Sequence, residues 1–136
     1  RLKDPIESVV YNSKALKPIA IIRTDVQESK THSLLNLMHN KVSFAKIYGD
    51  SGSLEILLKI PVKTHKLIIS GYDHLHRVNF KDWGLWVNNF TIVTAFEILT
   101  LNTLTIEYEE ISTRQLLFRW LSAYKNRHFI KSIEIY

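Results

Sequence analysis

The last third of the chain carries the clearest pattern of hydrophobic and polar positions. Residues 104–108 read as a strand, residues 112–125 as a helix and residues 130–136 as a second strand. Ser112 and Gln115 match a capping box at the start of that helix. Its apolar stripe, at helical spacing, consists of Leu116, Leu117, Trp120, Leu121 and Tyr124. The pattern predicts a helix that packs on the two strands and buries Trp120.

The same alternation is expected earlier in the chain. Residues 54–60 place Leu54, Leu57 and Leu58 on one helical face, and Pro61 ends that helix before a strand at residues 66–70. The remaining elements that the pattern predicts are a strand within residues 18–27, a short helix at 33–39, a strand at 42–48 and a helix at 91–99.

This order of elements predicts the fold class. Because a helix lies between successive strands, we expect the strands at 42–48, 66–70, 104–108 and 130–135 to be neighbours in one sheet with parallel pairing. The expected fold is α/β, a leucine-rich-repeat-like slab of alternating strands and helices with a largely parallel sheet on one face.

Length and composition favour one domain, spanning residues 1–136. A chain of 136 residues with 46% hydrophobic and 23% charged positions is typical of a folded globular protein. The absence of cysteine favours a reducing compartment, and no apolar run approaches the roughly 20 residues that span a bilayer. Residues 1–5 contain neither an initiator methionine nor an apolar signal core. We therefore expect a fragment of a longer intracellular protein, cytoplasmic or nuclear, without membrane contact.

The net charge of +5 raises the question of nucleic acid. The lysines and arginines are scattered along the chain, and neither an aromatic and basic platform nor a helix with several arginines on one face is present. Nucleic-acid binding therefore ranks behind the other functions considered below.

Residue patterns for catalysis and metal binding are weak. No serine stands in a Gly-x-Ser-x-Gly elbow, and residues 51–53 lack the lysine of a phosphate-binding loop. His74 and His76 alternate beside Asp73 as metal ligands can, although a polar loop that carries two histidines is the better explanation. We expect no catalytic residue, no cofactor and no metal, and therefore no enzyme.

Residues 72–90 form an irregular segment rich in aromatic side chains and histidine. Aromatic and arginine side chains are enriched at protein interfaces, and loops on a rigid scaffold often carry specificity. We expect a protein-binding site composed of Tyr72, His74, His76, Arg77, Trp83 and Trp86. The alternative for Trp83 and Trp86 is one shared helical face that covers the core.

Residues 96–106, 116–121 and 130–135 together resemble the C-terminal half of the nematode F-box-associated domain, type 2. In that family a leucine-rich step leads into a strand, then a helix with a tryptophan, then a closing strand. Leu99, Leu101 and Asn102 match the step, and Trp120 matches the helical tryptophan. The resemblance extends over residues 63–136.

The resemblance implies substrate recognition for an SCF-type cullin-RING ubiquitin ligase. No F-box pattern is visible in residues 1–60, so contact with the ligase adaptor would need an F-box outside this chain. A scaffolding repeat domain without a ligase connection would share every feature described, and an enzyme would need a pocket of converging titratable groups. From the sequence we expect a protein–protein interaction module that binds a protein substrate or partner.

Overall fold

The computed structural model describes residues 6–11, 19–32, 34–37, 44–88, 91–92 and 95–136. These residues form β-strands and one short 3-10 helix, η1 (Leu34–Leu37), and none of them lies in an α-helix. In chain order the strands are β1 (Ile6–Tyr11), β2 (Ile19–Thr24), β3 (Gln27–Glu28), β4 (Ala45–Tyr48), β5 (Gly52–Ser70), β6 (Phe80–Val87), β7 (Thr91–Ile92), β8 (Ala95–Leu99), β9 (Thr103–Ala123), β10 (Arg127–Ile130) and β11 (Ser132–Ile135).

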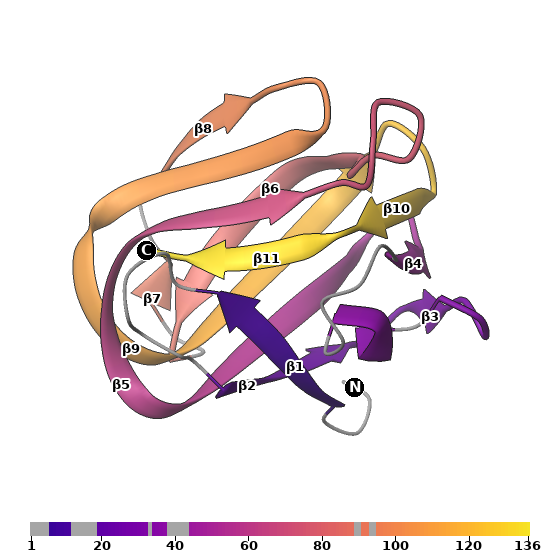
Figure 1. Cartoon of the computed structure of the whole chain (residues 1–136). Helices are drawn as coiled ribbons and strands as arrows, with labels where there is room; N and C mark the ends of the chain where they lie inside the picture. Colours follow the sequence, from indigo (N-terminus) through magenta and orange to yellow (C-terminus); the bar gives the residue numbers. More distant parts are fainter. Residues whose placement is uncertain (1–5, 12–18, 33, 38–43, 89–90, 93–94) are drawn as a thin grey trace.

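Two long antiparallel strands, β5 and β9, organise the molecule. They pair from Gly52 opposite Trp120 to Ser70 opposite Thr103, and the register shifts between Leu57 and Val62 and again near Lys66. Such irregularities bend a paired ribbon. Figure 1 shows both strands curling over on the same side of the molecule. The bend lets one ribbon contribute to both layers of a β-sandwich.

Each half of the ribbon has its own neighbours. The first half of β5 pairs with β2 and the second half pairs with β11, both antiparallel. The first half of β9 pairs with β8 and the second half with β6, which in turn pairs with β7. Strand β1 joins β11 to β2. The sandwich is therefore built from one continuous hydrogen-bonded path that folds over itself.

The core lies between the layers and follows the two-residue period of a strand. Partners across the ribbon, such as Leu54 with Phe118 and Ile69 with Leu104, point to the same side and are buried. The largest fully buried side chains on β5 and β9 are Leu54, Ile56, Leu67, Ile69, Leu104, Ile106, Phe118 and Trp120.

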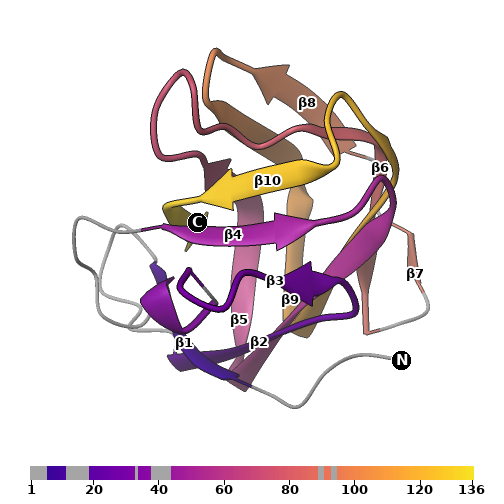
Figure 2. The same ribbon diagram turned by 90° about the vertical axis from the view of Figure 1, so that its right-hand side faces the viewer.

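A second, smaller sheet closes one end of the sandwich, with the strand order β10-β4-β3 (Figure 2). His128 and Ile130 of β10 stand opposite Ile47 and Ala45 of β4, and these side chains are buried. This sheet brings β10 close to the connection between β5 and β6, which is the place of the candidate site below.

The helix predicted at residues 112–125 is wrong, because β9 continues through it to Ala123. Leu116, Phe118 and Trp120 are buried, whereas Leu121, predicted in the stripe, is 72% exposed. The false helical spacing arose because the outer face of this strand also carries apolar residues. The predicted burial of Trp120 is confirmed, at 1% exposure.

The helix predicted at residues 54–60 is also wrong, since these residues belong to β5. Pro61 lies in the register shift between Leu57 and Val62, a position in a sheet that tolerates a missing N–H donor. Of the helix predicted at 91–99, residues 91–92 form β7 and residues 95–99 form β8, while residues 93–94 lie outside the described residues.

Other predicted elements fall where the structure has them. Strand β2 lies within the predicted strand at 18–27, β4 within 42–48, and η1 within the short helix at 33–39. Residues 33, 38–39 and 42–43 lie outside the described residues.

The predicted α/β slab with a parallel sheet is therefore wrong. The residues interpreted as crossover helices are strands, so successive strands join through turns and pair antiparallel. Among the described strands, β1 and β11 are the parallel pair. β5 and β9 are neighbours as expected, but they pair antiparallel instead of parallel. β4 belongs to the smaller sheet.

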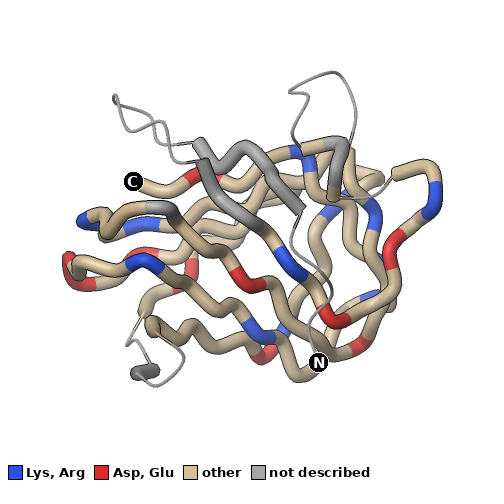
Figure 3. The backbone as a smooth tube through the Cα atoms, turned by 90° about the horizontal axis from the view of Figure 1, so that it is seen from below, with Lys and Arg blue, Asp and Glu red and all other residues tan. Residues whose placement is uncertain are grey.

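Charge is spread over the molecule. Figure 3 shows lysines and arginines distributed along the chain and interleaved with acidic residues. Within the described part of the chain, no helix is long and apolar enough to cross a bilayer.

Candidate functional site

Residues 71–79 connect β5 to β6 in a tight loop beside β10 (Figure 1). Asp73 shapes this loop, because its Oδ1 accepts the backbone N–H groups of Leu75 (2.9 Å) and His76 (2.7 Å). The His76 carbonyl in turn accepts the Tyr72 N–H at 2.8 Å. A loop with this many internal hydrogen bonds holds its side chains in fixed positions.

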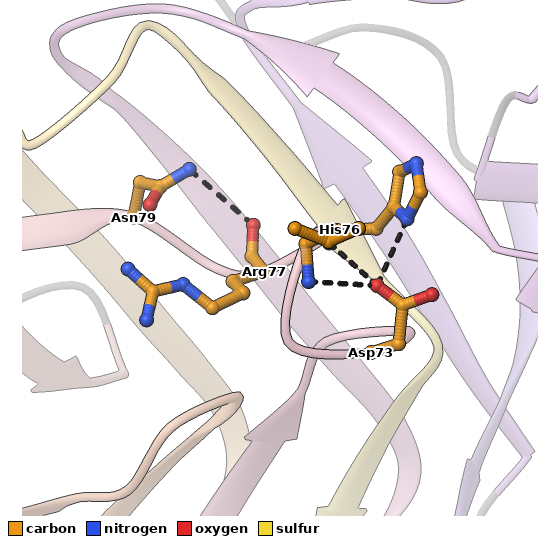
Figure 4. Close-up of polar contacts among 5 residues, drawn as sticks. Asp73, His76, Arg77 and Asn79 are labelled. Atoms are coloured by element: carbon orange, nitrogen blue, oxygen red, sulfur yellow. Dashed lines mark hydrogen bonds and ion pairs between the residues drawn. The ribbon is translucent and has the colours of Figure 1, made fainter.

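The same carboxylate orients the His76 ring. Nδ1 of His76 lies 2.9 Å from Oδ1 of Asp73, and the second ring nitrogen lies on the far side of the ring (Figure 4). Desolvation acts to raise the pKa of Asp73, but the hydrogen bonds from His76 and Leu75 lower that pKa overall. An ionised carboxylate only accepts, so Nδ1 carries a proton. Nε2 of His76 is the nitrogen that Asp73 does not hold, and 42% of the side chain is exposed.

His76 belongs to a cluster of aromatic rings at the surface, which we call the aromatic cluster: His32, Phe44, Tyr72, His76 and Phe129. Phe44 lies at the centre, with ring centroids 4.5 Å from His32, 4.9 Å from Tyr72, 5.7 Å from His76 and 5.4 Å from Phe129. All members are half-buried, so each ring keeps part of its surface in contact with solvent. The cluster combines apolar ring faces with polar groups on one surface.

The smaller sheet supplies the other side of this cluster. Phe129 comes from β10, and its N–H donates to the Arg77 carbonyl at 3.0 Å, which ties the strand to the loop. The side-chain amide of Asn79 adds a second tie to the Arg127 carbonyl, at 2.7 Å. Lys46 of β4 places its Nζ 5.2 Å from the Phe129 ring centroid. A cation therefore lies at the edge of the cluster.

Arg77 belongs to a different surface, although it follows His76 directly. Its guanidinium points away from Asp73 and His76 (Figure 4), and Nη1 donates to the Leu101 carbonyl at 3.1 Å. The loop thus presents the aromatic cluster on one side and an arginine on the other.

The structure gathers some of the residues predicted to form a binding site and separates others. Tyr72 and His76 meet in the aromatic cluster, with ring centroids 6.0 Å apart. His74 is exposed at the tip of the loop. Trp83 and Trp86 lie on β6. The predicted set is therefore scattered over several parts of the surface, since Arg77 also points away from the aromatic cluster.

The two tryptophans also differ in their surroundings. Trp83 lies over Phe118 with ring centroids 6.0 Å apart, and its Nε1 donates to Glu97. The Trp86 ring covers Gly84 and has the Arg119 guanidinium 5.6 Å from its centroid. The alternative of one shared helical face is wrong, because residues three apart on a strand point to opposite faces. Trp83 does pack against the core, as that alternative expected.

His32, Phe44 and Phe129 carry no signal in the sequence that links them to residues 72–77. Phe44 and Phe129 come together through the pairing of β4 with β10, which joins segments about eighty residues apart. His32 is held beside them by its carbonyl, which accepts the Lys46 N–H at 2.6 Å. As for metals, no group of three or more His, Asp or Glu in the described residues could hold an ion.

No protein-family model matches the sequence, and no curated protein matches it. Solved structures do share its fold. A family 32 carbohydrate-binding module from Clostridium perfringens in complex with GalNAc-β-1,3-galactose aligns with a TM-score of 0.70 at 9% identity, over 86% of this chain and 94% of that one. The family 32 module of C. perfringens NanJ in complex with galactose aligns with a TM-score of 0.70 at 11% identity, over 96% of this chain and 98% of that one.

A third similar structure is a GH29 fucosidase of Ruminococcus gnavus in complex with fucose. The TM-score is 0.64 at 15% identity, over 86% of this chain and 25% of that one, so this chain spans about a quarter of the fucosidase. Together these likenesses show that the chain shares the jelly-roll β-sandwich fold of family 32 carbohydrate-binding modules.

The resemblance to the nematode F-box-associated domain is therefore wrong. The helix that should carry Trp120 is a strand, and the solved structures that match are β-sandwiches. The sequence led us to expect ubiquitin-ligase substrate recognition or repeat scaffolding, with a protein substrate and a ligase adaptor as partners. These roles rested on a fold that the chain does not have. The alternative of nucleic-acid binding is likewise contradicted, because the matching modules are in complex with sugars.

Proposed function

We propose that this chain is a non-catalytic carbohydrate-binding domain and that the aromatic cluster binds the sugar. The observation that carries the proposal is the His76 ring, which Asp73 holds beside the half-buried rings of Phe44 and Phe129. Binding sites for small molecules typically combine apolar or aromatic walls with a few fixed polar groups. A likeness in fold to modules that hold galactose and a GalNAc disaccharide supports the same proposal.

The chemistry of the cluster suits a pyranose. A sugar ring has a face of C–H groups, which packs on an aromatic ring, and an edge of hydroxyl groups, which need hydrogen-bond partners. Nε2 of His76 accepts from a hydroxyl when the ring is neutral and donates when it is charged. The Tyr72 hydroxyl and the Lys46 ammonium provide further polar groups around the same rings. A neutral, hydroxyl-rich ligand can satisfy all of these groups together.

The test is isothermal titration calorimetry with galactose, N-acetylgalactosamine and fucose, compared with glucose. We expect at least one of the first three to bind saturably, with a Kd on the order of 0.1 to 1 mM, which is ordinary for one sugar on an open surface. His76→Ala should weaken binding about tenfold or more, because it removes the oriented polar group.

His74→Ala is the matched control, two residues away on the same loop and exposed. Its binding constant should equal that of the unmodified chain, and both variants should keep the circular dichroism spectrum of the parent. Absence of saturable binding to all of these sugars would contradict the proposal. Equal affinity of His76→Ala and His74→Ala would place the site elsewhere.

A further inference from the structure

A separate hollow lies on the opposite side of the loop from the aromatic cluster. It measures about 160 Å³ and opens between residues 77–80, the turn from β8 to β9 and the turn from β9 to β10. Figure 1 shows the first two of these segments at the same end of the sandwich. Its lining residues are Arg77, Val78, Phe80, Leu99, Thr100, Leu101, Leu104 and Tyr124.

The hollow has an apolar floor and an exposed rim. Val78, Phe80 and Leu104 at the bottom are part of the buried core, whereas Leu101 and Tyr124 at the mouth are 63% and 62% exposed. Large apolar side chains that remain exposed around a hollow are a sign of a binding site, because a well-packed sandwich end would cover them.

Positive charge lies at the mouth. Arg77 uses Nη1 to contact the Leu101 carbonyl, and a guanidinium has five N–H donors in a planar fork. Lys81 holds its Nζ 5.5 Å from the Tyr124 ring centroid. None of the described lining residues is acidic. The carboxylates of β6 and β8, Asp82 and Glu97, accept hydrogen bonds from Ser122 and Trp83.

The volume sets the size of the apolar group. A cavity of about 150 Å³ lined by aliphatic and aromatic side chains holds one benzene molecule. A floor of this size and chemistry therefore fits a ring or a short branched chain, and a planar carboxylate at the mouth would match the arginine fork. From the hollow, its floor and its cationic rim, we propose that this pocket binds a small organic carboxylate with an apolar body of about the size of one ring.

This proposal does not rest on sugar binding. Arg77 points away from His76, so the two ligands would lie on different sides of the loop (Figure 4). The probe is benzoate, added to the ¹⁵N-labelled chain and followed by amide chemical shifts. We expect saturable shifts at Thr100, Leu101 and Tyr124, with a Kd on the order of 1 mM. Benzyl alcohol, which lacks the charge, and acetate, which lacks the ring, should each bind about tenfold more weakly.

Two variants separate the roles of charge and cavity. Arg77→Met should weaken benzoate binding about tenfold. Lys125 is an exposed cation in the turn from β9 to β10 that does not line the hollow, so Lys125→Met should leave benzoate binding unchanged. Leu101→Trp at the rim should fill the mouth and abolish binding. His76→Ala should bind benzoate as the unmodified chain does. Shifts that map elsewhere, an affinity unchanged by Arg77→Met or by Leu101→Trp, or no saturation at about 50 mM benzoate would overturn the proposal.

Discussion

His128 offers a sharp test of how this sandwich end is held together. Its side chain is fully buried in β10 and stacks on Phe80 with ring centroids 4.3 Å apart. Nε2 lies 2.8 Å from the Gly49 carbonyl oxygen, and Nδ1 lies 3.2 Å from the Asn79 backbone nitrogen. A carbonyl only accepts and a backbone N–H only donates, so the ring is neutral with its proton on Nε2.

Protonation of this ring would direct a second N–H at the Asn79 N–H. Burial lowers the pKa of His128 below its ordinary value of 6.5, while the Gly49 carbonyl and the Asp50 charge act in the opposite direction. At pH values between the lowered pKa and 6.5, His128 binds a proton in the unfolded chain but not in the folded chain. The free energy of unfolding should therefore decrease as the pH falls below 6.5, by up to about 1.4 kcal/mol per pH unit from this group.

His128→Phe keeps the ring stack and removes both hydrogen bonds. In this variant the buried Asn79 N–H has no acceptor, whereas the Gly49 carbonyl still accepts a hydrogen bond from Trp120 Nε1. The cost at neutral pH should be about 2 to 4 kcal/mol, the sum of one unsatisfied buried donor and one lost hydrogen bond. Because the variant has no proton to take up, this cost should shrink as the pH falls.

The assay is urea denaturation of three proteins between about pH 5 and pH 8: the unmodified chain, His128→Phe and His74→Gln. The exposed His74 variant should follow the unmodified chain throughout. The curve for His128→Phe should approach the other two on acidification. A constant difference between His128→Phe and the unmodified chain at every pH would refute the assignment of a neutral, buried His128.

Other predictions follow from the strand assignment and the core. Trp120→Ala should lower the free energy of unfolding by about 3 to 5 kcal/mol in chemical denaturation, whereas Leu121→Ala, on the exposed face, should lower it by less than about 0.5 kcal/mol. Equal losses would favour the helix predicted at residues 112–125 over the strand. Gly52→Ala should lower stability by about 1 to 3 kcal/mol in the same assay, because its Cβ would collide with Val26 and lie 2.9 Å from the Trp120 ring. Burial raises the pKa of Tyr108 to about 12, so an alkaline absorbance titration should show one late tyrosine that Tyr108→Phe removes.

Strand positions were in part readable from the sequence, and the topology was not. Runs of β-branched residues located β2 and the second half of β5, because such residues favour the extended backbone. The second half of β9 has a pattern that resembles a helix. Leu117 and Leu121 on its outer face directly follow the buried Leu116 and Trp120, so the two-residue period becomes hard to distinguish from a helical stripe.

The candidate site was readable only within one loop. Residues 72–77 attract notice because aromatic and ionisable side chains crowd into a short irregular segment, and Tyr72 and His76 do lie in the aromatic cluster. Phe44 and Phe129 reach the same cluster through the pairing of β4 with β10. That pairing depends on the bend of the β5–β9 ribbon and on the chain path around it. Local sequence patterns do not predict the pairing of segments so far apart in the chain.

Sugar binding at the aromatic cluster is tested most directly by a map of where a sugar contacts the molecule. The disaccharide GalNAc-β-1,3-galactose would be titrated into the ¹⁵N-labelled chain while amide chemical shifts are recorded. We expect saturable shifts at Tyr72, Asp73 and His76 on the loop and at Phe129 on β10, with amides of the exposed strand β8 unchanged. Shifts centred on β8 or on the outer face of β6, with none at the loop, would contradict it.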